Sequence, residues 1–275
     1  MIQFLVDDII KTALLEDVNY IDAAADNLLD PKHISKAKFL AKASGILAGI
    51  DVALRVFELL GDFKITKYID DGSAVNKGDI IAEIEGPTVL LLKGERTSLN
   101  LLQHMSGIAT MTAEAVKLTK GTNATITDTR KTLPGLRALQ KYAVTCGGGK
   151  NHRFNLSDAA MLKDNHIDAC GSITKAVETL REKIGHTVKI EVETRNLNEV
   201  KEALSTGCEI IMLDNMDCET MKKAVEMTNG KALLEASGNI TAETISAVAK
   251  TGVDIISIGA LTHSVKAFDI SLKIF

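Results

Sequence analysis

Residues 188–215 read VKIEVETRNLNEVKEALSTGCEIIMLDN, and this stretch shows the pattern that decides the fold. Two strand-like runs, VKIEVET and EIIMLDN, flank a segment in which apolar and charged residues alternate at helical spacing. A strand, an amphipathic helix and a second strand in this order form the unit from which parallel sheets and barrels are built. The stretch therefore predicts a βαβ unit.

The same alternation extends on both sides of this unit, from about residue 121 onward. The strand-like runs are ATITDT (124–129), AAMLK (159–163), VKIEVET (188–194), EIIMLDN (209–215), ALLEASG (232–238) and DIISIGA (254–260). Helical patterns occupy residues 173–184, 198–207, 219–228 and 241–250. Serial βα repetition predicts an α/β barrel, and these runs fall short of the eight strands of a closed one. Either a strand is missed or the barrel is incomplete.

The first part of the chain has a different rhythm. Strand-like runs at 37–49 and 79–92 lie within a stretch from Ser35 to about Leu92 that is broken by Gly and Asp turns. Apolar residues at helical spacing precede it, around Leu5 and Ile9, and follow it from Arg96 to Leu118. This pattern predicts a small α+β unit that leads into a long helix.

Composition excludes several classes of protein. The chain has 275 residues, 45% hydrophobic and 25% charged, which is typical of a globular protein with one large or two smaller domains. A formal net charge of −4 gives no global attraction to nucleic acid. Any binding of anions must therefore come from a local group of basic residues.

The cysteines and the N-terminal segment indicate the compartment. Cys146, Cys170, Cys208 and Cys218 form no C-x-x-C pair or common zinc signature, so we expect reduced thiols. The opening residues MIQFLVDDIIKTALLEDV lack a positively charged start and are interrupted early by aspartates. They therefore fit neither a signal peptide nor a membrane span, and we expect a cytoplasmic protein.

Polar residues follow nearly every predicted strand of the second part. They are Arg130 and Lys131, Lys163, Glu193, Asp214, Glu235 with Ser237, and Gly259. Parallel strands point their C-terminal ends at one face, so residues far apart in sequence converge there on one site. The alternative is that strand ends are polar because loops contact water, which explains one or two charges more easily than one at nearly every strand.

The densest chemistry lies in residues 128–166, DTRKTLPGLRALQKYAVTCGGGKNHRFNLSDAAMLKDNH. Its basic residues at the expected mouth are Arg130, Lys131, His152, Arg153, Lys163 and His166. Cations gathered in this way suit an anion with several carboxylates or phosphates. A solvated basic surface is the alternative, and we prefer it for Arg137 and Lys141 within a helical pattern. For Lys163, which follows an apolar run, we expect a buried strand end.

Two later segments have the features of a phosphate site. Ser237, Gly238 and Asn239 stand at the head of a predicted helix, and Ile258, Gly259 and Ala260 follow the last strand. Phosphates in barrels commonly bind at the loops after the final strands. The glycines at 147–149 form no P-loop, because Lys150 lacks the Ser or Thr that should follow it.

Two carboxylates complete the predicted site. Glu193 and Asp214 could accept hydrogen bonds from sugar hydroxyls or hold Mg²⁺ through water. Each could instead be a helix N-cap or the salt-bridge partner of a site cation.

These residues resemble the quinolinate phosphoribosyltransferase family. The matching motifs are D-T-R-K-T-x-P-G-L-R from 128, G-G-G-x-N-H-R from 147, K-D-N-H from 163, and E-R-T-x-L-N-x-L-x-x-x-S-G-I-A-T from 95. The segments E-V-E-T, L-D-N and S-G-N-I later in the chain match as well. The resemblance covers nearly the whole chain.

The resemblance implies a fold and a reaction. It implies an N-terminal α/β sandwich over residues 1–106, to which residues 264–275 return, and an open, incomplete α/β barrel of the type II phosphoribosyltransferases over 107–263. The implied reaction joins quinolinate to phosphoribosyl pyrophosphate (PRPP) and gives nicotinate mononucleotide, pyrophosphate and CO₂, within de novo NAD biosynthesis. It requires Mg²⁺ and no organic cofactor.

The resemblance also implies roles for named residues. Quinolinate is surrounded by Thr129, Arg130, Lys131, His152, Arg153 and Lys163, with Arg96 reaching in from a neighbouring subunit of a homodimer or higher even oligomer. Ribose and metal are held by Glu193 and Asp214, and the 5′-phosphate by Ser237, Gly238, Asn239, Ile258, Gly259 and Ala260. The implied catalytic residues are Lys131, Lys163, Glu193 and Asp214.

Two other hypotheses stay open at this point, and a third, a carrier function, is rejected. A molybdate-linked relative of the same superfamily is the nearest, although that group lacks parts of the T-R-K-T and N-H-R pattern. A barrel lyase would use Lys163 as a Schiff-base amine, which borohydride trapping would detect. Residues 71–87, DGSAVNKGDIIAEIEGP, resemble half of a lipoyl or biotinyl carrier domain, but no attachment lysine follows at the expected turn.

Overall fold

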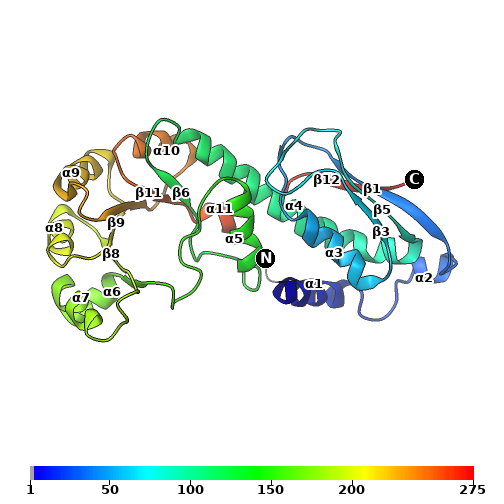
Figure 1. The fold of residues 1–275 in the computed structure, drawn as a ribbon, viewed down its shortest axis with the longest axis horizontal. Helices are drawn as coiled ribbons and strands as arrows, with labels where there is room; N and C mark the ends of the chain where they lie inside the picture. Colours follow the sequence, from blue (N-terminus) through cyan, green and yellow to red (C-terminus); the bar gives the residue numbers. More distant parts are fainter. Residues whose placement is uncertain (1–2) are drawn as a thin grey trace. The chain divides into compact units, whose positions relative to one another are not determined.

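The computed structural model describes residues 3–275 and divides them into two compact units (Figure 1). Met1 and Ile2, the first residues of the predicted N-terminal domain, lie outside the described residues. The first unit consists of Met1–Ala113, Thr132–Gly148 and Leu261–Phe275, and the second of Glu114–Lys131 and Gly149–Ala260. Each unit is described separately below.

The first unit is built on a four-stranded antiparallel sheet with the strand order β12-β1-β5-β3. Its strands are β1 (Ile34–Ala41), β3 (Lys64–Lys67), β5 (Ile80–Pro87) and β12 (Ile270–Ile274), and a separate pair joins β2 (Gly45–Ile46) to β4 (Ala74–Val75). Its helices are α1 (Gln3–Asp17), α2 (Ala25–Leu28), α3 (Ile50–Leu60), most of α4 (Thr88–Leu118), α5 (Arg137–Cys146) and nearly all of α11 (Ala260–His263). Because β12 pairs with β1, the C-terminal segment returns to the N-terminal sheet, as the resemblance implied.

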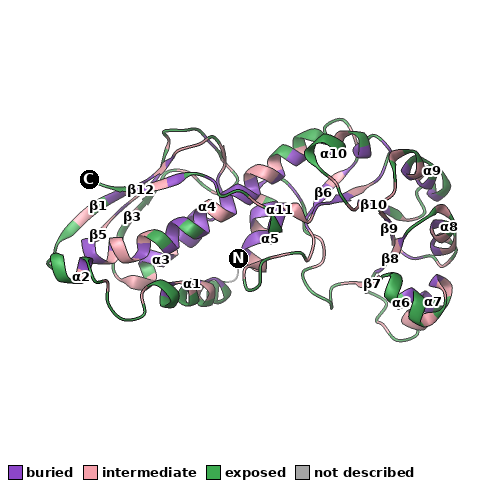
Figure 2. Ribbon diagram, turned by 180° about the vertical axis from the view of Figure 1, so that it is seen from behind, coloured by how far each residue is buried: buried purple, intermediate pink, exposed green. Residues whose placement is uncertain are grey.

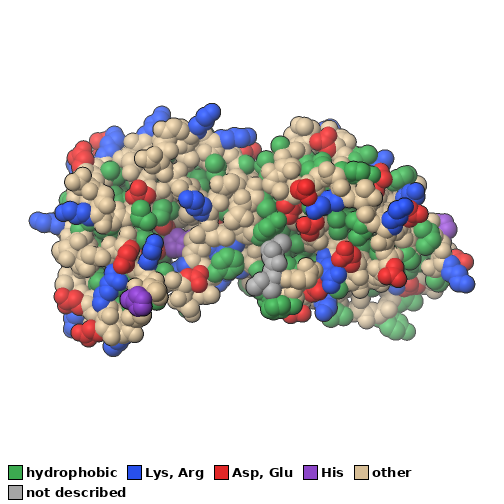
Figure 3. All heavy atoms as spheres, in the orientation of Figure 1, with side chains coloured by type: hydrophobic (Ala, Val, Ile, Leu, Met, Phe, Trp, Pro, Cys, Tyr) green, Lys and Arg blue, Asp and Glu red, His purple; other side chains and the backbone are tan. Residues whose placement is uncertain are grey.

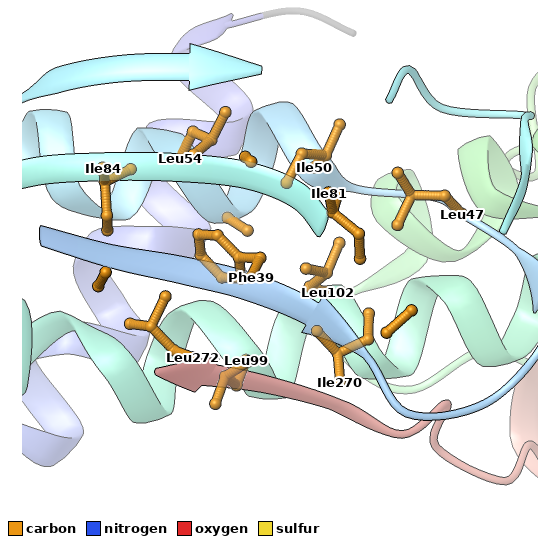
Figure 4. Packing of buried hydrophobic residues seen from close by; sticks show 14 of the residues in the cluster. Phe39, Leu47, Ile50, Leu54, Ile81, Ile84, Leu99, Leu102, Ile270 and Leu272 are labelled. Atoms are coloured by element: carbon orange, nitrogen blue, oxygen red, sulfur yellow. The ribbon is translucent and has the colours of Figure 1, made fainter. Parts of the chain in front are cut away.

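Two apolar clusters hold this unit together. In the first, part of which is shown in Figure 4, Phe39 of β1 and Leu102 of α4 are fully buried. Phe39 also meets Phe57 of α3 edge to face, with ring centroids 6.2 Å apart. In the second, Ile10 of α1 packs in one cluster with Val144 of α5 and with residues of α3 and α4. Figure 2 shows the buried stretches of α4 and α5.

The prediction of strands from Ser35 to Leu92 is wrong in two places. Residues 50–60 form helix α3, and the run after Pro87 belongs to helix α4, which begins at Thr88 rather than at Arg96. Leu91 of α4 is fully buried in the run after Pro87, which is almost continuously apolar and carries no periodicity that separates a buried helix from a buried strand. Helix α3 does carry such a signal, because its charged residues Asp51, Arg55 and Glu58 recur at helical spacing.

Lys141 of helix α5 is fully buried, so the prediction of a solvated surface there is wrong. Its neighbours Leu139 and Ala143 are also buried, which means that α5 is covered on more than one side. On such a helix a charged side chain does not mark a face open to water.

The second unit contains a six-stranded parallel sheet with the order β6-β11-β10-β9-β8-β7. The strands are β6 (Thr125–Thr127), β7 (Ala160–Leu162), β8 (Ile190–Thr194), β9 (Ile210–Asp214), β10 (Leu233–Ser237) and β11 (Ile255–Ser257). The helices are α6 (Asp164–Cys170), α7 (Ile173–Arg181), α8 (Leu197–Ser205), α9 (Cys218–Thr228) and α10 (Ala242–Ala249). Every predicted strand and each of the four predicted helices is confirmed.

The barrel is open between its first two strands. Among the strands of the described part of the chain, β6 pairs only with β11 and β7 only with β8, so these two strands form the edges of the sheet, and β6 makes one further isolated bridge from Thr127 to Lys150. The open, incomplete α/β barrel that the resemblance implied is therefore confirmed.

The two faces of this sheet have opposite character. On β8 the fully buried Ile190 and Val192 point to one face, and Glu191 and Glu193 point to the other. The strand register carries the same division across β9 and β10, where Glu193 lies level with Met212 and Ser237 level with Asp214. The apolar face packs against the helices and the polar face lines the interior of the open barrel, where a closed barrel carries branched apolar side chains.

Three further features bear on the sequence predictions. No helix among the described residues is long and apolar enough to cross a membrane. The four cysteines are free. On the face drawn in Figure 3, acidic and basic side chains are interspersed, as expected for a small net charge.

Candidate active site

The second unit has a cavity of about 580 Å³ at the C-terminal ends of its parallel strands. It is lined by Thr129, Arg130, Lys131, His152, Arg153, Met161, Lys163, Glu193, Met212, Asp214, Asn215, Glu235, Ser237, Gly238, Asn239 and Ser257. The structure thus brings together most of the residues that the sequence singled out. It does not place Arg96, Ile258, Gly259 or Ala260 in the lining.

The charges around the cavity are divided between strands. The basic side chains come from the segments beside the edge strands β6 and β7, and are Arg130, Lys131, Arg153 and Lys163. The carboxylates Glu193 and Asp214 come from the ends of the central strands β8 and β9, whereas Glu235 of β10 is buried beneath them. The cavity therefore has a basic side and an acidic side, which we call the basic wall and the acidic wall.

Lys163 joins the two walls. Its Nζ lies 3.3 Å from Oε2 of Glu193, so the alternative of a salt bridge to a site cation is realised for this carboxylate. The side chain of Lys163 is 50% exposed, and the prediction of a buried strand end is wrong. The strand ends at Leu162, which is buried, and the next residue already opens helix α6.

His166, grouped with the site cations by sequence, does not line the cavity. Its Nδ1 accepts the backbone N–H of Lys163 at 3.0 Å, which makes it part of the start of α6.

Arg153 is held by neutral acceptors. Nη1 donates to the carbonyl oxygen of Ala159 at 3.1 Å and Nη2 to the sulfur of Met161 at 3.3 Å. Burial and the nearby Arg130 lower the pKa of the Arg153 guanidinium, which nevertheless stays charged at all physiological pH values. Two cations held close together in this way favour a ligand with more than one negative charge.

A buried cluster forms the floor of the cavity. Nε2 of His152 lies 3.3 Å from Oε2 of Glu191 and 3.3 Å from Oε2 of Glu235, and both carboxylates are 1% exposed. Burial lowers the pKa of His152, but the two carboxylates outweigh it and raise that pKa to about 10. Burial also raises the pKa of Glu191, and the neighbouring Glu235 adds to the effect.

The hydrogen bond at the other ring nitrogen, Nδ1, disfavours the protonated, charged form of the imidazole. Nδ1 of His152 accepts the backbone N–H of Arg153 at 2.8 Å, which requires a lone pair on Nδ1. An imidazolium beside two carboxylates, and a neutral imidazole beside one carboxylate and one carboxylic acid, contain the same number of protons. The cluster therefore carries a net charge of −1 in both forms.

Several floor residues were missed from sequence or given no role. Met212 and Ser257 of the lining precede the predicted strand-end residues, as does Glu191, which contacts His152 from below the lining, and Glu235 was noted only as polar. Buried oxygens of Ser257 and Glu235 in the lining have no hydrogen-bond partner among the described residues, and the same is true of both carboxylate oxygens of Glu191 beneath it, so the floor offers polar atoms to a ligand or to water. A signal was present, because residues two apart on a strand share a face and Glu191 stands two before Glu193.

On the acidic wall, Asn215 links two strand ends. Its Nδ2 donates to Oδ2 of Asp214 at 2.8 Å, and its Oδ1 accepts Nδ2 of Asn239 at 3.1 Å. Asn215, Gly238 and Asn239 all have positive φ angles, of 54°, 94° and 48°. A Cβ on Gly238 would overlap Oδ1 of Asn215, so this turn requires glycine for space as well as for conformation.

Arg96 lies elsewhere. It is an exposed residue of α4 in the first unit, where it lines a separate hollow of about 450 Å³ with residues of α1 and of the segment 134–136. Of the last predicted phosphate segment, Ile258 is buried and its N–H donates to the carbonyl oxygen of Thr127 at 3.0 Å.

An open βα barrel with a basic wall, an acidic wall and a glycine turn at its strand ends suits the binding of anionic substrates. The model of the quinolinate phosphoribosyl transferase C-terminal domain matches residues 108–273, and that of the N-terminal domain matches residues 22–106. The chain belongs to the quinolinate phosphoribosyltransferase family.

Individual relatives agree with this assignment. The chain is 45% identical over 261 residues to the probable nicotinate-nucleotide pyrophosphorylase [carboxylating] of Bacillus subtilis, covering 94% of this chain and 90% of that one. It is 44% identical to the protein of the same description from Methanocaldococcus jannaschii, covering 97% and 96%.

Solved structures show the same fold. The nicotinate-nucleotide pyrophosphorylase of Francisella tularensis superposes with a TM-score of 0.96 at 40% identity, over 100% of this chain and 98% of that one. Human nicotinic acid phosphoribosyltransferase shares the fold alone, with a TM-score of 0.59 at 11% identity over 89% of this chain and 70% of that one.

We predict that Gly238→Ala destabilises the protein more than Gly207→Ala does. Both glycines have positive φ, which costs an alanine about 1–2 kcal/mol, but a Cβ at Gly207 meets nothing within 4 Å. At Gly238 the new methyl group must also displace Asn215. Denaturant unfolding of both variants measures the difference, and equal losses of unfolding free energy would contradict the described packing of Asn215.

Proposed function

We propose that the cavity of the second unit transfers the phosphoribosyl group of PRPP to quinolinate and releases CO₂, giving nicotinate mononucleotide and pyrophosphate. The chain is a decarboxylating phosphoribosyltransferase of pyridine nucleotide biosynthesis, as its family and its relatives' descriptions indicate. The observation that supports this assignment to the cavity is the division of its lining into a basic and an acidic wall.

The basic wall suits the pyridine dicarboxylate. Quinolinate carries two adjacent carboxylates, and each can pair with the planar fork of an arginine or with a lysine ammonium. Arg130, Lys131, Arg153 and Lys163 supply these groups in one cavity, with Thr129 and His152 beside them. A nicotinate lacks the 2-carboxylate and would leave part of this wall without a counter-charge.

The acidic wall suits the sugar phosphate. Glu193 and Asp214 can accept hydrogen bonds from the ribose hydroxyls and stabilise the positive charge that develops on the ribose as pyrophosphate leaves. The turn formed by Ser237, Gly238 and Asn239 offers backbone N–H groups to the 5′-phosphate. We include Ile258, Gly259 and Ala260 in this phosphate site, although they follow β11 outside the lining of the cavity.

Glu193 and Asp214 also fit a Mg²⁺ ion. Both are half-buried carboxylates, and each has an oxygen besides the one engaged by Lys163 or Asn215. Hard oxygen donors of this kind suit Mg²⁺, which keeps several of its waters and binds phosphates at the same time. When bound, the ion would neutralise charge on the departing pyrophosphate.

The reaction follows from these positions. The pyridine nitrogen attacks C1′ of the ribose, the C1′–oxygen bond to pyrophosphate breaks, and the ring nitrogen becomes cationic. The bond from C2 to its carboxylate then breaks, CO₂ leaves, and the electron pair at C2 is stabilised by the adjacent positive nitrogen until it takes up a proton. The chain's contribution is to hold the two substrates in line and to balance their charges.

Arg96 carries the proposal of a site shared between subunits. It is exposed on α4 of the first unit, and the family resemblance assigns it to quinolinate. We propose that it completes the cavity of a partner subunit across a two-fold axis, so that a homodimer or a higher even oligomer is the active form.

We predict that the protein releases CO₂ from carboxyl-labelled quinolinate only when PRPP and Mg²⁺ are both present. Nicotinate should be a poor acceptor and nicotinamide a poorer one, because they leave the basic wall partly unpaired. Radiometric CO₂ release and nucleotide chromatography measure the two results. Comparable turnover of nicotinate and quinolinate would instead place the chain with the non-carboxylating transferases.

We predict that two inactive variants restore activity when mixed. Arg96→Ala and Lys131→Ala subunits should each be inactive alone, but a hybrid dimer has one cavity with both residues intact. Activity should therefore return after subunit exchange, which native mass spectrometry can follow. Hybrid dimers that form without any activity would show that Arg96 acts within its own chain.

A further inference from the structure

The cluster of Glu191, His152 and Glu235 lies beneath the charged cavity residues that, in the proposed function, bind the substrates. Glu191 comes from β8 and Glu235 from β10, two strands that are separated in the sheet by β9. Nε2 of His152 lies 3.3 Å from both carboxylates, so one imidazole connects the two strands. No role in binding or chemistry has so far been given to either glutamate.

His152 is held at every polar atom of its ring. Nε2 meets the two carboxylates, and Nδ1 accepts the backbone N–H of Arg153 at 2.8 Å. Its own backbone N–H donates to Oδ1 of Asp128, a fully buried residue after β6, at 2.9 Å. The ring therefore has no N–H directed at a ligand, and it fixes the position of its chain segment instead.

The residue that this segment carries into the cavity is Arg153. The hydrogen bond from its backbone N–H to Nδ1 of His152 sets the turn of the chain from which its side chain leaves. Two of the five guanidinium N–H groups are accounted for by Ala159 and Met161, which leaves others for a carboxylate. The direction of the guanidinium thus depends on the ring, and the ring depends on the two carboxylates.

We propose that Glu191 and Glu235 are positioning residues for the dicarboxylate subsite, and that they act through the His152 ring on Arg153. The inference rests on the proposed function of the cavity, since it concerns the affinity for quinolinate. The glutamates do not touch the ligand. They hold the basic wall in the geometry that two adjacent carboxylates require.

The sharpest test is a double-mutant cycle between Glu235 and His152. Glu235→Met keeps the length of the side chain and removes the acceptor, and it leaves one carboxylate beside the imidazole, so no buried charge loses its only partner. We expect it to raise the Kd for quinolinate at least about tenfold, which is the range for a lost charge-assisted contact. The Kd for PRPP should change by less than about twofold.

In the same cycle, His152→Ala should raise the Kd for quinolinate by a similar factor. Adding Glu235→Met to His152→Ala should then change this Kd by less than about twofold, because without the imidazole Glu235 no longer affects the position of Arg153. Glu235→Gln should stay within about threefold of the wild type, since its amide oxygen still accepts from Nε2. A merely structural role would instead move the two Kd values and the melting temperature together.

Glu202→Met is the matched control. Glu202 accepts hydrogen bonds from the backbone N–H and the hydroxyl of Thr174 at 2.9 and 3.1 Å, so its removal breaks similar bonds away from the cavity. It should leave both Kd values within about twofold of the wild type. If Glu235→Met does not fold, Glu191→Met replaces it in the cycle, and Glu235→Gln still tests the acceptor.

The outcomes separate the inference from the function on which it rests. A wild type that binds no quinolinate contradicts the proposed function itself. A wild type that binds quinolinate, with effects of Glu235→Met and His152→Ala that multiply in the double variant, overturns the inference alone. A stoichiometric metal ion in the purified protein that disappears with Glu235→Met would also overturn it, because three such ligand atoms within 4.8 Å of one another can hold a metal ion.

Discussion

Burial of Glu191 and Glu235 in the sheet of the second unit is the constraint on which the rest of the site depends. Two carboxylates that are each only 1% exposed can be buried only where neighbouring groups compensate their negative charge. His152 supplies the nearest such group, and it belongs to the segment between the edge strands rather than to a strand. The interior of this barrel is therefore completed from a connecting segment.

The open edge of the barrel follows from the same arrangement. A closed barrel of eight strands fills its interior with layers of branched apolar side chains. Here the interior face carries Glu191, Glu193, Asp214 and Ser237, and the segment after β6 returns beside that strand through the pairing of Thr127 with Lys150. The space between β6 and β7 thus admits the basic residues that balance the acidic wall.

Much of this architecture could be predicted from sequence. The βα units of the second unit have short apolar strands and amphipathic helices, so periodicity alone locates them. In the first unit the apolar run around Leu91 carries no period, so its helix could not be distinguished from a strand, whereas α3 could have been predicted from the helical spacing of Asp51, Arg55 and Glu58. The burial of Lys141 could not be predicted from sequence, because it depends on which elements pack around helix α5.

The sequence predicted those site residues that follow strand ends. It did not predict those that lie within the strands, beneath the lining of the cavity. Lys163, Glu193 and Asp214 stand at strand ends and line the cavity. Glu191 is inside a strand that reads as a buried core segment, and only the structure shows that its partner is a histidine 39 positions earlier in the chain. The inward face of Glu191 could be predicted from its spacing to Glu193, but its long-range pairing with His152 leaves no local signal.

The division of the cavity into two walls is most directly tested by a crystal structure with phthalate, which has the two adjacent carboxylates of quinolinate but no ring nitrogen to react. The account predicts that both carboxylates lie within hydrogen-bond distance of the basic wall, with at least one on Arg153. Phthalate bound at Glu193, Asp214 and the Gly238 turn, or outside the cavity, would contradict it.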